Sequence, residues 1–273
     1  MPSKQTIVSY APPQLIHWGK SLVSSDYRRK ARELARLRAL PRYRRTTTNL
    51  LGKPVEAVDA ASFVSMYGEI FEQQIYRFET ANPQPYIIDG GANIGLSVLY
   101  FKRLYPESRI VAFEADEEVF SVLRKNVETS GHDDVELVCR ALWSSETRLS
   151  FMSEGADGGR VAREGDAGSK FAETVRLRSY LNRPVDFLKL DIEGAETEVL
   201  RDSADLLGNV DKLFVEYHSF AEGEQTLDVL VGVLAGAGFR LHVHTVMSSP
   251  QPFVSRRVDG GYDMQLNIFA FRQ

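Results

Sequence analysis

The chain has 273 residues, of which 43% are hydrophobic and 26% are charged, which suits one α/β domain with an extension. Its longest apolar runs are too short to cross a bilayer, and its N-terminus lacks the apolar segment of a signal peptide. A single cysteine, Cys139, excludes an internal disulfide and cysteine-rich zinc or iron–sulfur sites. We therefore expect a cytoplasmic protein.

The net charge of −4 hides an asymmetry between the two parts of the chain. Residues 1–45 carry 11 Lys/Arg and two Asp/Glu, a net charge of +9, so the remainder carries −13. Apolar residues at helical spacing predict an amphipathic basic helix over about 24–40. This helix either stays in water or contacts an anionic substrate carrier, a membrane surface or the acidic remainder. We expect no nucleic-acid partner, because the main domain is not basic. The sequence does not decide whether the protein forms a homo-oligomer.

Further along the chain, residues 46–51 and 55–58 predict a small hairpin, and Asp59 is a good N-cap for a helix through about 78. From Tyr86, apolar strands alternate with helical segments, which indicates a parallel sheet. The glycine-rich residues 153–169 predict a mobile loop that could act as a lid. The expected organisation is a basic, mainly helical extension over 1–80 and a main domain over 81–273. The expected strands are 86–89, 109–114, 135–139 and 185–191, and the helices between them are 94–104 and 117–130.

The most informative stretch is residues 86–95, where an apolar strand runs into Asp89, a glycine turn and a helix. This order opens the nucleotide site of a doubly wound α/β domain, and glycines let the ligand approach the backbone. Ala92 breaks the dinucleotide glycine spacing, and Asp89 would repel a pyrophosphate, so NAD is disfavoured. Asp89 suits a cationic ligand, such as the amino group of a methionine moiety beside a sulfonium. Asn93 tolerates a left-handed conformation. The turn resembles the first motif of S-adenosylmethionine-dependent methyltransferases, with an ordinary strand–turn–helix junction as the alternative.

Glu114 ends the second strand, where nucleotide folds place a carboxylate that binds the ribose hydroxyls. Asp116 begins the next helix, as a helix cap or as a neighbour of the adenine. The cofactor residues that we predict are Asp89, Gly90, Gly91, Asn93, Gly95, Glu114, Ala115, Asp116, Ala141 and Asp191.

The second half of the chain carries further polar groups at strand ends. Asp191 follows the strand over 185–190, and Glu216 and His218 end the strand that begins at Leu213. Ligands of open α/β sheets bind beyond the carboxyl ends of the strands, so these groups should converge with Asp89 and Glu114.

Four segments together resemble the FkbM-type methyltransferase family: residues 89–95, 113–114, 187–196 and 215–218. The resemblance covers about residues 60–273, and the first 45 residues have no clear counterpart. It implies a doubly wound, Rossmann-like sheet of seven strands, whose last strand, about 265–271, is antiparallel. It also implies S-adenosylmethionine as the cofactor. Members of the family mostly methylate hydroxyls of sugars, glycans or polyketide products.

An O-methyltransferase needs a base, because an alcohol is a poor nucleophile until its proton is removed. His218 is our first choice, since its ordinary pKa lies near neutrality, and Asp191 and Glu216 are the further catalytic residues that we predict. Asp191, Glu193, Glu216 and His218 also offer metal ligands, but their spacing matches no metal signature. We therefore predict no metal site and leave a divalent ion open.

The acceptor is expected to be a hydroxylated sugar, a glycan or a related natural product. Its pocket should use the segment from Tyr67 to Tyr76, the glycine-rich loop with Arg160, and the link over 244–263. The enzyme alternative is N-methylation of another acceptor. Residues 191–194 read Asp-Ile-Glu-Gly rather than the Asn/Asp-Pro-Pro-aromatic loop of base amino methyltransferases, so a nucleic-acid base is disfavoured. The other alternative is a module that binds S-adenosylmethionine without turnover, against which the strand-end carboxylates and His218 argue.

Overall fold

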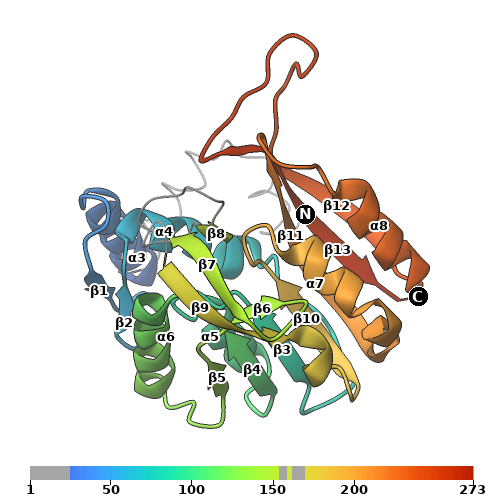
Figure 1. Cartoon of the computed structure of the whole chain (residues 1–273). Helices are drawn as coiled ribbons and strands as arrows, with labels where there is room; N and C mark the ends of the chain where they lie inside the picture. The colour runs from blue at the N-terminus through green and yellow to red at the C-terminus, as the bar shows by residue number, and fades with distance from the viewer. Residues whose placement is uncertain (1–24, 154–158, 162–169, 273) are drawn as a thin grey trace, which may run out of the picture.

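A computed structural model describes residues 25–153, 159–161 and 170–272 (Figure 1). In this part of the chain the main sheet has seven strands in the order β12-β13-β11-β10-β3-β4-β5, and β13 is antiparallel to both of its neighbours. The doubly wound sheet with an antiparallel last strand is thereby confirmed. The strands are β3 (Tyr86–Gly90), β4 (Arg109–Phe113), β5 (Glu136–Val138), β10 (Val185–Leu190), β11 (Val210–Phe220), β12 (Arg240–Met247) and β13 (Tyr262–Phe271).

Helices cover both faces of this sheet, as the continuous apolar character of its central strands requires. One face packs against an aromatic cluster that includes Phe78, Phe101 and Phe187, and the other packs against aliphatic residues such as Val199 and Leu234. The first face carries α3 (Ser25–Arg38), α4 (Ala60–Tyr67), α5 (Leu96–Leu104) and α6 (Glu117–Thr129), and the second carries α7 (Glu196–Asp202) and α8 (Leu227–Gly236). Two 3-10 turns, η2 (Leu177–Tyr180) and η3 (Ala204–Asn209), also lie on the second face.

The described part of the N-terminal segment shares the aromatic core. The basic helix forms as α3, and it buries Leu34 and Leu37 against the sheet-covering layer. The expected hairpin forms from β1 (Thr46–Thr48) and β2 (Val55–Ala57). The helix expected through residue 78 ends earlier, because α4 continues as a π-helical turn, η1 (Gly68–Gln73), and Gln74 then takes a left-handed φ of 58°. The boundary at residue 80 stays a prediction.

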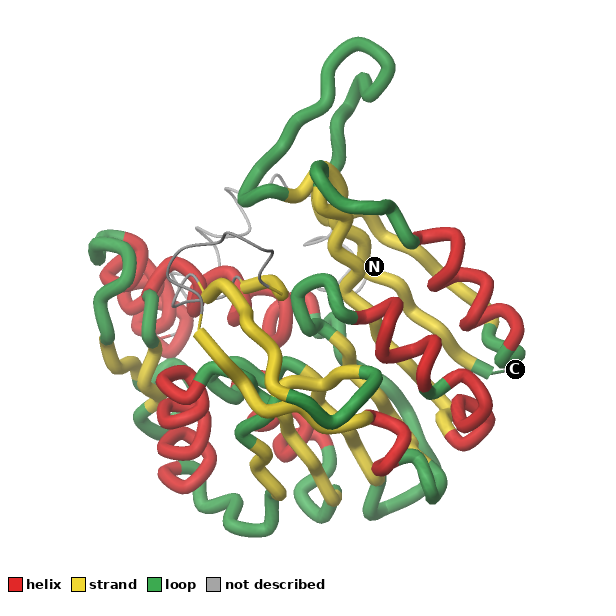
Figure 2. The backbone as a smooth tube through the Cα atoms, viewed as in Figure 1, coloured by secondary structure: helices red, strands yellow, loops and turns green. Residues whose placement is uncertain are grey.

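A second sheet, which the sequence did not predict, lies beside the cavity described below. Its order is β6-β9-β7-β8, and Figure 2 shows its strands as a separate layer in front of the main sheet. Of the predicted mobile loop, residues 159–161 form a strand, and 154–158 and 162–169 lie outside the described residues. The strands are β6 (Ala141–Trp143), β7 (Arg148–Ser153), β8 (Gly159–Val161) and β9 (Lys170–Arg176).

None of the helices in the described residues is both long and apolar enough to cross a membrane.

The glycine turn gives the first prediction. Gly91 has a φ of 80°, and a Cβ there would lie 1.8 Å from the carbonyl oxygen of Asp191. We expect Gly91→Ala to lower the free energy of unfolding by at least about 2 kcal/mol, measured by urea denaturation. The control is Gly232→Ala in α8, where nothing lies within 4 Å of an added Cβ. Alanine there should be neutral or stabilise by about 0.5–1 kcal/mol. Equal stability of the two variants would contradict the close approach of the two strand ends.

Candidate active site

A cavity of about 400 Å³ opens at the carboxyl ends of the central strands. It lies where the strand order reverses between β3 and β10, which is where doubly wound sheets bind their ligands. Most of the predicted site residues line it, but Asp89, Gly90, Gly95 and His218 do not. The predicted residues on its wall are Gly91, Asn93, Glu114, Ala115, Asp116, Ala141, Asp191 and Glu216.

The glycine turn is tied to the end of β4. The backbone N–H groups of Gly91 and Ala92 both donate to the carbonyl oxygen of Phe113, at 3.0 and 2.8 Å. Asn93 takes a left-handed φ of 48°, which confirms that prediction, and Gly95 is the N-cap of α5, with a φ of 90°. Gly91, Ala92 and Asn93 of the turn line the cavity, and these hydrogen bonds fix the course of their backbone.

Glu114 is held in place by the backbone on both sides. Its Oε2 accepts the N–H of Asn93 at 3.0 Å, and its Oε1 accepts the N–H of Asp116 at 2.9 Å. Burial raises the pKa of Glu114 to about 7, although these two N–H groups oppose the shift. Asp116 caps α6 by accepting the N–H of Glu118 at 2.8 Å, and Lys170 pairs with its other oxygen at 2.6 Å. Asp116 is therefore both a helix cap and part of the cavity wall.

Asp89 lies behind the cavity wall and does not line the cavity. Its carboxylate is fully buried, accepts a hydrogen bond from Ser97 and lies 3.3 Å from the ammonium nitrogen of Lys189. The cause is the strand register, which pairs Asp89 with Lys189 across β3 and β10. The predicted contact of Asp89 with a cationic ligand is thus replaced by an internal ion pair.

Lys189 connects three parts of the site. Its Nζ donates to the carbonyl oxygen of Gly91 at 2.8 Å and lies 3.5 Å from Oδ2 of Asp191. Burial lowers the pKa of Lys189, but the carboxylates of Asp89 and Asp191 outweigh burial and hold that pKa above its ordinary value. A charged Lys189 therefore fixes the glycine turn against the end of β10.

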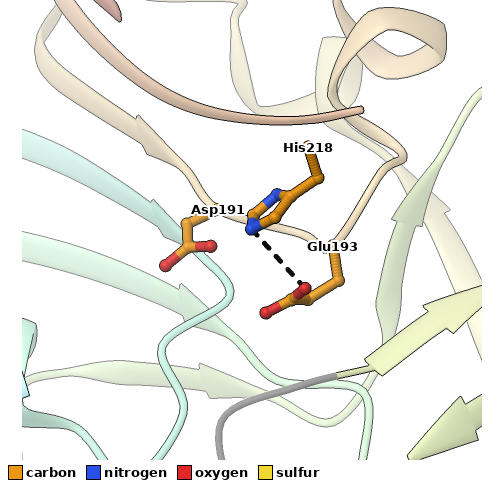
Figure 3. A group of neighbouring side chains, drawn as sticks. All are labelled: Asp191, Glu193 and His218. Carbon is orange, nitrogen blue, oxygen red and sulfur yellow. Dashed lines mark ion pairs between the residues drawn. The ribbon is translucent and has the colours of Figure 1, made fainter. Parts of the chain in front are cut away.

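His218 lies among several carboxylates (Figure 3). Its Nε2 is 3.6 Å from Oε2 of Glu193 and 3.7 Å from Oε1 of Glu216, and its Nδ1 is 3.4 Å from Oε1 of Glu196. Glu196 is itself held by the N–H groups of Ile192 and Gly194, at 3.0 and 3.1 Å. The cavity thus has a strongly acidic side at the ends of β10 and β11.

This surrounding changes the role predicted for His218. Burial lowers its pKa, but the carboxylates of Glu193 and Glu196 outweigh burial and raise that pKa to about 10. An imidazolium cannot accept a proton at neutral pH, and the ring lies behind the cavity wall. The arrangement does not support His218 as the base, whereas Asp191 and Glu216 do face the cavity. Burial also raises the pKa of Glu193 and Glu216.

Several cavity residues carried no predicted role. Trp143 and Phe151 come from the second sheet, and Gln265 comes from β13. The sequence offered one signal for these roles, Lys189, a cation in the apolar C-terminal part of β10. Of the expected acceptor pocket, Glu69, Tyr76 and Val246 line the cavity, and the side chain of Arg160 lies outside the described residues.

The sheet order, the glycine turn and the strand-end carboxylates are those of the S-adenosylmethionine-dependent methyltransferases. The family model described as Methyltransferase FkbM domain matches residues 89–241. The chain belongs to the FkbM methyltransferase family, and the family implies S-adenosylmethionine as the methyl donor.

Three known proteins illustrate the similarity. Methyltransferase sdnD of Sordaria araneosa is 31% identical over 173 residues, which cover 50% of this chain and 67% of sdnD. The 2-O-methyltransferase NoeI of Sinorhizobium fredii (strain NBRC 101917 / NGR234) is 24% identical over 176 residues, which cover 56% of this chain and 72% of NoeI. Among solved structures, methyltransferase FkbM from Methylobacillus flagellatus KT superposes with a TM-score of 0.46 at 15% identity. The superposition covers 89% of this chain and 60% of the Methylobacillus flagellatus chain.

The buried ion pair gives the second prediction. We expect Lys189→Met to lower the free energy of unfolding by about 3–5 kcal/mol, because it leaves the carboxylate of Asp89 buried without its cation. Arg257→Met is the control, because Arg257 pairs with Asp259 at 2.7 Å where both side chains are exposed. It should change the free energy by no more than about 1 kcal/mol. If thermal or urea unfolding gave similar losses of free energy for the two variants, the ion pair of Lys189 would stabilise the fold no more than a surface pair does.

Proposed function

We propose that this chain transfers a methyl group from S-adenosylmethionine to a hydroxyl of a sugar, a glycan or a related natural product. The observation that carries the proposal is the pair of carboxylates, Asp191 and Glu216, on the wall of the cavity beside the glycine turn. The name of NoeI, a 2-O-methyltransferase at 24% identity, supports transfer to oxygen.

The residues present fit S-adenosylmethionine. A cavity of about 400 Å³ falls within the usual range for small-molecule sites, roughly 300–1,000 Å³. Glu114 offers acceptor oxygens for two ribose hydroxyls, and Trp143 and Phe151 offer apolar surface for the adenine. Bound S-adenosylmethionine would supply the methyl group: its S–CH₃ bond breaks as the O–CH₃ bond forms, and the sulfur keeps the bonding electron pair.

The strand order separates the two ends of the site. Glu114 follows β4 and Glu216 lies in β11, three strands away in the order β11-β10-β3-β4. At about 4.8 Å per strand they are about 14 Å apart. A ligand that lies across the strand ends with its ribose at Glu114 would therefore extend toward Asp191 and Glu216. The acceptor hydroxyl would approach from the acidic side.

The protein contributes positioning and proton removal. Holding the hydroxyl in line with the methyl group supplies much of the rate of such a displacement. Burial raises the pKa of Glu216 to about 8, and in its ionised form Glu216 takes the proton of the hydroxyl as the oxygen forms its new bond. Asp191, which is fixed by Lys189, orients the reacting groups.

The proposal is tested by incubating the protein with methyl-labelled S-adenosylmethionine and a panel of sugar nucleotides, glycolipids and hydroxylated metabolites. NMR of the product locates the label, and we expect an O-methyl ether. A label on nitrogen would instead favour N-methylation. Tight cofactor binding without turnover on any panel member would favour a binding module.

The pKa of Glu114 predicts a pH dependence of cofactor binding. A raised carboxyl pKa of about 7 means that the ionised acceptor is lost as the pH falls through 7. The affinity for S-adenosylhomocysteine should therefore fall by up to about tenfold between pH 8 and pH 6, measured by calorimetry. Glu114→Gln should bind more weakly with a flat profile. Glu117→Gln, at an exposed position in α6, should keep the wild-type profile. A flat profile for the wild-type protein would refute the ribose contact.

Loss of the proposed base should affect turnover rather than cofactor binding. We expect Glu216→Gln to lower kcat by roughly 10²–10⁴-fold, with little change in the affinity for S-adenosylhomocysteine. The matched control is Glu224→Gln, an exposed glutamate shortly after β11, which should keep the full rate. A near-normal kcat in the Glu216 variant would show that another group accepts the proton of the hydroxyl.

A further inference from the structure

We propose that Asp191, Glu193 and His218 form a binding site for one divalent transition-metal ion on the acidic side of the cavity. Each residue offers one ligand atom, and these atoms all lie within 4.8 Å of one another. Figure 3 shows the three side chains converging from the end of β10 and from β11. Binding of the metal does not depend on the proposed function. Its use in holding an acceptor hydroxyl rests on that function.

The spacing of the ligand atoms fits a shared ion. Nε2 of His218 lies 3.6 Å from Oε2 of Glu193. Two atoms that each bind an ion at about 2.1 Å are about 3–4 Å apart, depending on the coordination geometry. Small rotations of the side chains would complete the set, because the side chains of Asp191 and Glu193 are 24% exposed at the cavity.

The imidazole of His218 is held as a metal ligand usually is. Nδ1 faces the carboxylate of Glu196, and Glu196 is fixed by the N–H groups of Ile192 and Gly194. A histidine ligand almost always donates its other ring N–H to a carboxylate or a carbonyl, which fixes the ring and its tautomer. Nε2 faces the cluster and also lies 3.2 Å from Nε2 of Gln265. A metal ion that binds there would displace the proton from Nε2 and leave the other ring proton on Nδ1. Glu193 is positioned in the same way by the hydroxyl of Tyr262, at 2.7 Å.

The charge of the cluster also favours a cation. Asp191, Glu193 and Glu216 all reach the cavity wall, and Lys189 is shared between Asp191 and Asp89. Buried carboxylates are costly unless a cation pairs with them, and a divalent ion would balance the excess. An imidazole combined with carboxylates suits Mn²⁺, Fe²⁺ or Zn²⁺ better than Mg²⁺ or Ca²⁺.

A metal at this position would deepen the proposed function. The remaining coordination positions would face the cavity, since Asp191 and Glu193 line it. An acceptor hydroxyl that binds there would be oriented toward the cofactor and would lose its proton more readily. The proton would pass to Glu216, whose Oε1 lies 3.7 Å from Nε2 of His218.

The test is the binding of Mn²⁺ to the metal-free full chain, followed by the loss of the free-ion electron paramagnetic resonance signal. We expect one Mn²⁺ per chain, and at least tenfold weaker binding by Glu193→Gln and by His218→Gln. Binding of S-adenosylhomocysteine by each variant reports that it has folded. The control is His242→Gln, because His242 and His244 form a separate exposed pair with their ring nitrogens 2.9 Å apart. This variant should bind Mn²⁺ like the wild type.

Two results would overturn the inference. One is the absence of Mn²⁺ and Zn²⁺ binding at millimolar concentrations. The other is Mn²⁺ binding that the Glu193→Gln and His218→Gln variants leave intact, whatever the effect of His242→Gln. Methyl transfer that proceeds fully in the presence of a chelator, without metal binding, would refute the metal site and leave the proposed function standing. Metal binding to the cluster in a protein that methylates no hydroxyl would support the metal site and refute the proposed function.

Discussion

Lys189 lies almost fully buried between two strand ends, and its ammonium group contacts the carboxylate of Asp89, the carboxylate of Asp191 and the carbonyl oxygen of Gly91. A buried cation of this kind is stable only with such partners, and each partner is fixed in return. Tyr76 places its ring over the same ammonium, with Nζ 5.7 Å from the ring centroid. The cation therefore joins β3, β10 and the segment before the sheet at one point beneath the cavity.

The contacts of Lys189 also determine how the two sides of the cavity are arranged. With the glycine turn fixed against β10, Glu114 stands on one side of the strand reversal and the acidic group around His218 stands on the other. The first side offers a carboxylate whose two oxygens are aligned by backbone N–H groups, and the second offers carboxylates at the ends of β10 and β11. In the proposed function, the methyl donor binds at the first side and the hydroxyl acceptor approaches from the second.

Local pattern was enough to predict the sheet, the glycine turn and the position of Glu114, because strand and helix periodicity and strand-end carboxylates are set by neighbouring residues. The second sheet was missed, since β7 and β9 pair across residues 154–169, and such a pairing leaves no local signal. The role of Asp89 was misjudged for a similar reason, because only the strand register shows that Lys189 lies beside it. The ring of carboxylates around His218 likewise depends on the meeting of β11 with the turn after β10.

The central claim is that one cavity holds a methyl donor at Glu114 and presents its methyl group to the acidic side. A crystal structure with S-adenosylhomocysteine bound tests it most directly. The account predicts ribose hydroxyls within hydrogen-bonding distance of Glu114, and the sulfur of the ligand between the glycine turn and Asp191. A ligand bound in the opposite direction, or outside the cavity, would contradict the account.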